Sequence, residues 1–305
     1  MYDIQKNDYD LVKRKEELIS RYIQYLDVAE KTQNTYQNGL KMFFEYLCTR
    51  NIKNPAREDI LGFKDLLKET RTLNTTNTYM IAIRNFFKWL SYEKIYDNIT
   101  ENIKGVNTGN NHKRLPLSNE QFLMVLNGCK NNREKMILCL TTSLGLRANE
   151  IVNIRLSDFK EIDGVVCLYL LGKGRDGKVD YVPINDDLYK MIQDYIQEYG
   201  ITDYLFTSLR SDVGGKVTTK TIRYIVKEMF KRVGICSDEY SLHSLRHTFA
   251  TTSIKNGADV REVSKALRHK SIHTTEIYLH DIEMQNNKCF GITNELFIKG
   301  GTNNA

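Results

Sequence analysis

The sequence is poor in helix-breaking residues and has no long apolar run. Only three prolines and one tryptophan occur in 305 residues. No apolar segment approaches the ~20 residues that a membrane-spanning helix needs, so we expect no membrane partner. Hydrophobic residues make up 41% of the chain and charged residues 27%, the composition of a soluble globular protein large enough for one or two domains.

Cysteine pairs and strong charge are absent as well. The six cysteines are scattered, and none forms a C-x-x-C pair. Because no signal-peptide pattern precedes them, we expect reduced thiols in a cytoplasmic protein. The net charge of +6 is too small to establish nucleic-acid binding by itself.

The first third of the chain has the periodicity of helices. Between residues 16 and 104 apolar residues recur every three or four positions, which predicts a four- or five-helix bundle. Residues 1–15 are polar and charged and are expected to form a loose tail or the start of a first helix. Thr75 or Thr76 is expected to cap the fourth helix. A polar segment with two glycines predicts a linker over 105–114.

The rest of the chain mixes helices with a short hairpin. Over residues 115–285 the pattern predicts β-strands at 165–171 and 179–184, joined by a turn at 172–177 that carries Lys173. Helices are expected before and after this hairpin. The fold class is therefore mainly α with a small β-sheet, followed by a C-terminal segment at 286–305 that contains an apolar stretch.

Histidines are concentrated near the C-terminal end. Five of the six fall between residues 243 and 280. His243 lies three residues before Arg246, so both are expected on one side of a helix start, with Arg246 in the first turn. His247 points away from that side, and we interpret it as structural.

Two histidine pairs have the i, i+4 spacing that could bind zinc on a helix. The acidic residue of the zinc-protease motif is missing, because Ser244 follows His243. No cysteine stands close by in the sequence. We therefore expect no metal site.

The residue types in this region suit phosphate chemistry. Cleavage of a phosphodiester places negative charge on oxygens that fixed cations must stabilise. Arg147 and Arg246, each beside a helix start, can bind such oxygens. Tyr278 can attack phosphorus as a phenolate, and Lys173 can protonate the leaving oxygen. Each residue alone has a plainer interpretation, such as a surface arginine, a turn lysine or one of 18 tyrosines.

Five motifs occur together in one order. They are Arg147 in Gly-Leu-Arg-Ala-Asn-Glu, Lys173 in Gly-Lys-Gly, His243-x-x-Arg246, Leu267-Arg268-His269, and Tyr278 in Thr-Thr-Glu-Ile-Tyr. In order and spacing the chain resembles the tyrosine recombinase (phage integrase) family, in particular its Xer-type members and the short integrases of mobile elements. The resemblance implies that residues 16–104 form a SAM-like core-binding domain on DNA and that 115–285 form an α/β catalytic domain.

The resemblance also implies a reaction. Tyr278 attacks the scissile phosphate of DNA and forms a 3′-phosphotyrosine link. Arg147 and Arg246 bind the phosphate oxygens, and Lys173 protonates the 5′-oxygen. The strand is later resealed without a metal or nucleotide cofactor.

Further implications concern assistance and assembly. His243 and His269 assist by hydrogen bonding and proton transfer. Four protomers join two double-stranded DNA sites and exchange strands through a Holliday junction, for DNA integration, excision or chromosome dimer resolution. The apolar stretch in segment 286–305 is by itself compatible with a final helix that packs on its own core, whereas the resemblance implies that the segment docks into a neighbouring protomer.

One position departs from the family pattern. The family usually has Leu-Gly-His where this chain has Leu267-Arg268-His269. A glycine allows a positive φ there, which an arginine adopts only at a cost. Either the backbone bends differently or Arg268 contacts DNA. Other candidates for DNA phosphate contacts are basic residues of the helical bundle, namely Lys31, Lys41, Arg84 and Lys88.

Two other functions stay open from the sequence. Type IB topoisomerases share the arginine, lysine, histidine and tyrosine chemistry but relax supercoils as monomers. A DNA-binding factor with a silent active site is a third possibility, although such a factor would not need the whole catalytic set. A covalent protein–DNA adduct would exclude the silent factor, and a recombinant product would exclude the topoisomerase.

Overall fold

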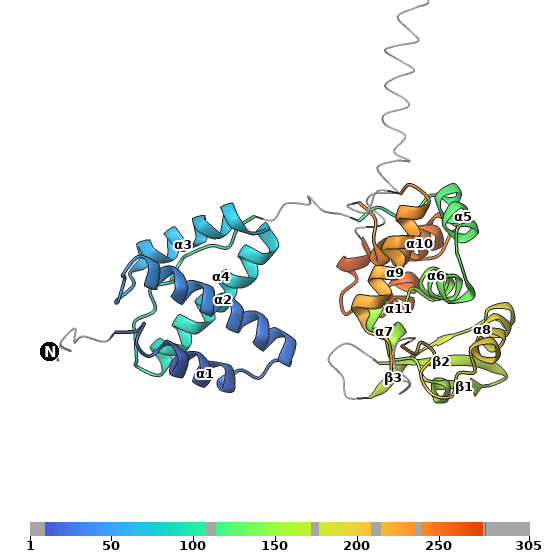
Figure 1. Ribbon diagram of the computed structural model, residues 1–305, viewed down its shortest axis with the longest axis horizontal. Helices are drawn as coiled ribbons and strands as arrows, with labels where there is room; N and C mark the ends of the chain where they lie inside the picture. Colours follow the sequence, from blue (N-terminus) through green and yellow to red (C-terminus); the bar gives the residue numbers. More distant parts are fainter. Residues whose placement is uncertain are drawn as a thin grey trace, which may run out of the picture. The chain divides into compact units, whose positions relative to one another are not determined.

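The structure is a computed structural model that describes residues 10–107, 114–171, 177–208, 215–235, 239–276 and 278. The chain divides into two compact units, residues 1–111 and 112–305 (Figure 1). The described part is mainly helical with one three-stranded antiparallel sheet, which confirms the predicted fold class. None of the described helices is long and apolar enough to cross a membrane.

Within residues 10–107, the first unit contains four helices. They are α1 (Lys15–Tyr25), α2 (Glu30–Thr49), α3 (Arg57–Thr70) and α4 (Leu73–Tyr92). Helix α4 packs along α2, and their aromatic side chains meet edge to face in the core. This core explains the helical periodicity, since its phenylalanines are at most 1% exposed: Phe43, Phe44, Phe63, Phe86 and Phe87.

The start of α4 differs from the prediction. Thr72 caps this helix, because its Oγ1 accepts the N–H of Thr75 at 3.3 Å. Thr75 and Thr76 therefore lie inside the first turn. The Thr76 hydroxyl donates to the carbonyls of Leu67 and Thr72, so it ties α3 to α4 instead of capping.

Side chains hold the chain ends of both units on either side of the predicted linker. Asn77 of α4 donates to the Val106 carbonyl and accepts the Val106 N–H, both at 2.9 Å. In the second unit, the Leu117 N–H donates to Thr248 Oγ1 at 2.9 Å. The first residues of the predicted linker at 105–114 are thus bound to the helical bundle.

The second unit opens with α5 (Asn119–Asn127), α6 (Asn132–Leu144) and α7 (Ala148–Val152). A short 3-10 turn leads into β1 (Phe159–Ile162), β2 (Val165–Leu171) and β3 (Lys178–Pro183), paired in that order. The predicted hairpin is present, but its turn, with Lys173, lies outside the described residues. The remaining helices are α8 (Asp186–Tyr199), α9 (Thr219–Arg232), α10 (Leu242–Lys255) and α11 (Val260–Ala266).

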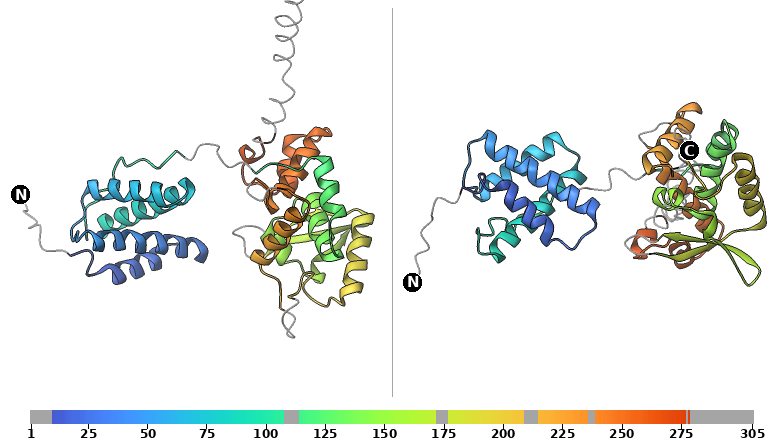
Figure 2. Two further views of the ribbon diagram at one scale, coloured as in Figure 1. Left: turned by 45° about the horizontal axis from the view of Figure 1, so that its top comes forward. Right: turned by 60° about the horizontal axis from the view of Figure 1, so that its bottom comes forward.

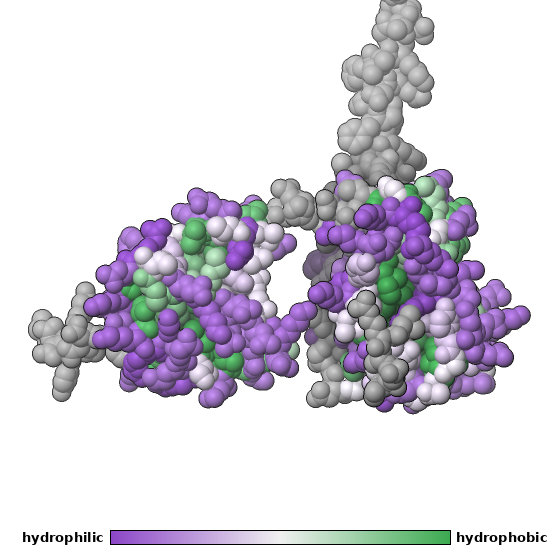
Figure 3. Space-filling view, in the orientation of Figure 1, coloured by the Kyte–Doolittle hydropathy of each residue, from purple (hydrophilic) through white to green (hydrophobic). Residues whose placement is uncertain are grey.

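Helix α6 is central to the core of the second unit. It packs against α8, α9 and α10, and Figure 2 shows these helices around it. Ile137, Leu138 and Leu140 are fully buried there. Hydrophilic side chains cover much of the face seen in Figure 3, whereas the apolar side chains of each core are buried.

Helix α10 begins earlier than predicted. Ser241 is its N-cap and accepts the His243 N–H at 3.2 Å, so the helix starts at Leu242. Arg246 is therefore beyond the first turn, and the prediction of its position was wrong. His243 does lie in the first turn.

Candidate phosphate-binding active site

Two left-handed turns meet at the centre of the site. Gly145, which follows α6, has φ +59°, and Arg268, which follows α11, has φ +55°. A Cβ at Gly145 would lie 2.7 Å from Leu267 Cδ2 and 2.9 Å from Phe249 Cδ1. Only glycine allows both this φ and this close approach. The two turns are consequently pressed together.

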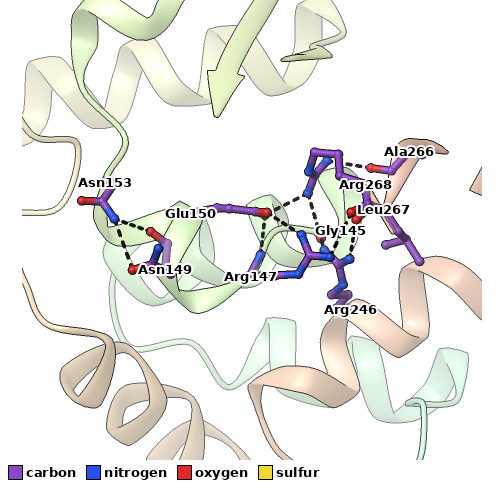
Figure 4. A network of polar contacts seen from close by, with 9 residues as sticks. All are labelled: Gly145, Arg147, Asn149, Glu150, Asn153, Arg246, Ala266, Leu267 and Arg268. Atoms are coloured by element: carbon purple, nitrogen blue, oxygen red, sulfur yellow. Dashed lines mark hydrogen bonds and ion pairs between the residues drawn. The ribbon is translucent and has the colours of Figure 1, made fainter. Parts of the chain in front are cut away.

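The carbonyls of these turns hold Arg246. Its guanidinium donates to the Gly145 and Leu267 carbonyl oxygens (Figure 4). Arg246 is only 4% exposed. Burial, followed by the charge of Arg147, lowers the pKa of Arg246 to about 9, so the side chain still carries its charge at neutral pH.

Arg147 is held from α7 by a buried carboxylate. Its backbone N–H donates to Glu150 Oε2 at 2.8 Å, and its Nη1 donates to Glu150 Oε1 at 2.7 Å. Its Nη2 donates to the Arg268 carbonyl at 3.3 Å. The Arg147 side chain is 26% exposed, so part of it is open to solvent.

Arg268 keeps the left-handed backbone that glycine would favour. The expectation of a differently bent backbone was therefore wrong. Its Nη2 lies 2.9 Å from Glu150 Oε2, its Nη1 donates to the Ala266 carbonyl at 2.6 Å, and its side chain is 8% exposed. A non-glycine residue in this conformation costs about 1–2 kcal/mol. In the structure the side chain faces Glu150, and a contact with DNA stays a prediction.

Glu150 is the functional residue that the sequence motifs do not single out. It is 4% exposed and lies between two arginines. Burial raises the pKa of its carboxyl group, but the charge of Arg268 and the hydrogen bond from Arg147 outweigh burial and hold it below its usual range. The signal was present as an acidic residue three positions after Arg147, the spacing of a capping box.

The two candidate catalytic histidines are neutral at physiological pH. Burial and the charges of Arg246 and Arg147 lower the pKa of His269 to about 4. His243 is exposed at the start of α10, but desolvation by the surrounding protein and then the charge of Arg223 lower its pKa. His269 Nδ1 lies 2.8 Å from the hydroxyl of Thr275, which is fully buried and thereby orients the ring.

Tyr278 lies against α10. It is 8% exposed, and the His247 ring meets its ring edge to face, with centroids 4.8 Å apart. Burial raises the pKa of Tyr278, while the charges of Arg246 and Arg147 lower it and offset part of this effect. The contact with His247 appears only in the folded chain.

The structure brings five of the six predicted catalytic residues into one neighbourhood. Tyr278, His243 and His269 each lie within electrostatic reach of both Arg147 and Arg246. The sixth, Lys173, falls outside the described residues. Among the described residues, no group of three or more His, Cys, Asp and Glu side chains could hold a metal ion.

The predicted DNA contacts of the first unit differ in exposure. Lys31, Lys41 and Lys88 are exposed on α2 and α4. Arg84 is half-buried, and its guanidinium donates to the carbonyls of Met80 and Ile103 at 3.3 Å. Arg84 therefore stabilises its own unit, whatever else it binds.

A basic stripe on α9 is a second feature that the motifs do not reveal. Its exposed face carries basic residues three or four positions apart, so they share one side of the helix. One of them, Arg223, influences the pKa of His243 and so lies near the site. The stripe consists of Lys220, Arg223, Lys227 and Lys231.

Family models match both units. The phage integrase family matches residues 117–284, and the phage integrase N-terminal SAM-like domain matches residues 19–94. The tyrosine recombinase XerA of Pyrococcus horikoshii is 27% identical over 272 residues, covering 86% of this chain and 88% of that protein. Transposase A from transposon Tn554 of Staphylococcus aureus is 26% identical, with 94% and 92% covered.

Solved structures share the fold. The XerH site-specific recombinase bound to palindromic difH substrate, a post-cleavage complex, has a TM-score of 0.73 at 22% identity, covering 92% of this chain and 84% of that one. A lambda integrase tetramer bound to a Holliday junction has a TM-score of 0.69 at 15% identity, with 86% and 76% covered. The chain therefore belongs to the phage integrase family of tyrosine recombinases, enzymes that break and rejoin DNA strands at specific sites.

Proposed function

We propose that Tyr278 is the nucleophile of this recombinase and that Arg147 and Arg246 bind the scissile phosphate. The observation that carries the proposal is the pair of arginines, fixed by carbonyls and Glu150 within electrostatic reach of Tyr278. Two preorganised guanidinium groups stabilise the charge that develops on the phosphate oxygens. The reaction then needs no metal or nucleotide cofactor.

Strand cleavage is a phosphoryl transfer from the 5′-oxygen of DNA to Tyr278. A bond forms between Tyr278 Oη and phosphorus while the bond from phosphorus to the 5′-oxygen breaks. The phenolic proton of Tyr278 passes to the neutral His243 imidazole or to water, and Lys173 gives a proton to the 5′-oxygen, which leaves as a hydroxyl. Attack by a 5′-hydroxyl reverses the step and reseals the strand, because the phosphotyrosine ester retains the bond energy.

The raised pKa of Tyr278 keeps the phenol protonated before DNA binds. His269 serves as a hydrogen-bond donor to the phosphate. In the tautomer that serves this mechanism, the Thr275 hydroxyl donates to Nδ1 and the ring proton is on Nε2, from which a neutral His269 donates a hydrogen bond to phosphate. His243, also neutral, is available at the start of α10 for a second hydrogen bond or for proton transfer.

Double-stranded DNA binds along the basic faces of both units. Lys31, Lys41 and Lys88 contact phosphates from the SAM-like unit, and the α9 stripe contacts them beside the active site. Four protomers assemble on two DNA sites and pass through a Holliday junction. The segment 286–305, outside the described residues, docks into a neighbouring protomer. Its deletion would then reduce cooperativity in a gel-shift titration and leave binding to an isolated site nearly unchanged.

Trapping of the covalent intermediate tests the chemistry. The substrates are nicked duplexes with the sequences that flank the gene, in which the cleaved 5′-hydroxyl fragment diffuses away. The wild type should form an adduct that survives SDS, and Tyr278→Phe should form none. A wild type without adduct, or an adduct with Tyr278→Phe, would contradict the mechanism. Relaxation of supercoils without any recombinant product would favour a topoisomerase-like activity.

A further inference from the structure

Arg268 carries two costs that demand an explanation. Its φ of +55° lies in the region that favours glycine. Its Nε atom is buried and has no hydrogen-bond partner within the described part of the chain. Strain of this kind persists where surrounding contacts overdetermine it, and such positions cluster at functional sites.

The contacts of Arg268 connect both phosphate-binding arginines. Its guanidinium shares Glu150 with Arg147 and shares the Gly145 carbonyl with Arg246 (Figure 4). Its own carbonyl accepts from Arg147. One side chain thus reaches the acceptor of each arginine, although Glu150 lies 118 positions away in the chain.

The charges explain what this connection does. Glu150 is almost fully buried, so its attraction for Arg147 is only weakly screened by water. If Arg147 were its sole partner, the carboxylate would neutralise the guanidinium that has to attract phosphate. Arg268 places a second positive charge beside Glu150. The carboxylate is then shared between two arginines, and Arg147 keeps positive charge to attract the phosphate.

We infer that Arg268 is a positioning residue for DNA cleavage. Its positive charge offsets the negative charge of Glu150, so that Arg147 keeps its charge and its direction for the scissile phosphate. This inference rests on the proposed function. In this role Arg268 acts through its contacts with Glu150 and with the acceptors of Arg147 and Arg246.

A four-protein cycle tests this role: wild type, Arg268→Gly, Glu150→Gln and the double variant. The readouts are the single-turnover rate of adduct formation at saturating nicked duplex, and the Kd for the same duplex. We expect Arg268→Gly to slow adduct formation about tenfold with little change in Kd, since charge at the transition state is lost. The double variant should be faster than Arg268→Gly, because the glutamine introduced by Glu150→Gln keeps an acceptor oxygen without the charge.

Two controls separate positioning from a structural role. Lys94→Gly relieves a similar positive φ of +57° at an exposed position of the other unit, and its adduct rate should equal that of the wild type. Arg268→Lys keeps the charge without the planar fork, so its rate should lie between those of the wild type and Arg268→Gly. Thermal unfolding of every variant shows whether the rates come from folded protein.

The outcomes are distinguishable. A wild-type adduct rate for Arg268→Gly would overturn the inference and leave the proposed function intact, and so would a double variant no faster than Arg268→Gly. If Arg268→Gly does not fold, the same cycle is measured with Arg268→Lys. A wild-type adduct rate for Arg268→Lys that does not change when Glu150→Gln is added then overturns the inference. A wild type that forms no adduct removes the proposed function and this inference together.

Discussion

Replacement of Gly145 by alanine tests the packing of the two turns that hold the arginines. Two terms add in this substitution. Alanine at φ +59° costs about 1 kcal/mol of backbone strain. Its Cβ would lie 2.7 Å from Leu267 Cδ2 and 2.9 Å from Phe249 Cδ1, and relief of such overpacking costs about 1–3 kcal/mol. We expect the unfolding free energy to fall by about 2–4 kcal/mol.

The chain offers a matched control for the strain. Gly200 ends α8 with φ +58° and ψ 41°, close to the φ +59° and ψ 34° of Gly145, and lies in the same unit. A Cβ at Gly200 would meet nothing within 4 Å. Gly200→Ala therefore carries only the backbone term of about 1 kcal/mol. The difference between the two variants measures the close approach.

Calorimetry of the full-length variants measures both effects. For a unit of this size, 1 kcal/mol corresponds to about 2–4 °C in Tm. Gly145→Ala should lower the Tm of the catalytic unit by about 4–16 °C, and Gly200→Ala by about 2–4 °C. Adduct formation should fall at least about tenfold for Gly145→Ala below its Tm, because the Gly145 carbonyl positions Arg246. Equal Tm losses for the two variants would refute the steric reasoning.

Three further predictions concern the residues around the nucleophile. Thr275→Val, which removes the hydrogen bond to His269 Nδ1 at similar volume, should slow adduct formation about tenfold, whereas Thr275→Ser should restore most of the rate; equal rates for both would contradict the positioning of His269. His247→Ala should slow adduct formation more than His247→Phe, which keeps an aromatic edge against Tyr278, and the ratio of the two rates is the measurement. Because the pKa of His269 is lowered to about 4, only the unfolded chain takes up a proton at this residue as pH falls from about 6.5 toward 4. The wild type should therefore lose about 1–3 kcal/mol of stability in this window that His269→Asn does not lose. Urea titrations at several pH values measure this difference, and parallel stability profiles for the two proteins would contradict it.

The local pattern of the sequence was sufficient to predict the helices and strands and to name most residues of the candidate site. Apolar periodicity records which helix face is buried, so the four helices of the first unit and the hairpin of the second could be predicted. The order and spacing of five motifs, from Arg147 to Tyr278, identified the family. Helix starts were less predictable, as Thr72 and Ser241 show, because several neighbouring hydroxyl residues can serve as caps and packing selects one.

By itself, the sequence determined which segments form helices and strands, the family and the residue types available for phosphate chemistry, because these depend on short-range order along the chain. Only the tertiary structure decided how the charges are balanced. The turn after α6 and the turn after α11 meet because Gly145 has no Cβ, and this contact brings Arg268 to Glu150 from 118 positions away. No local pattern records such a contact, since it depends on how two distant turns pack in three dimensions.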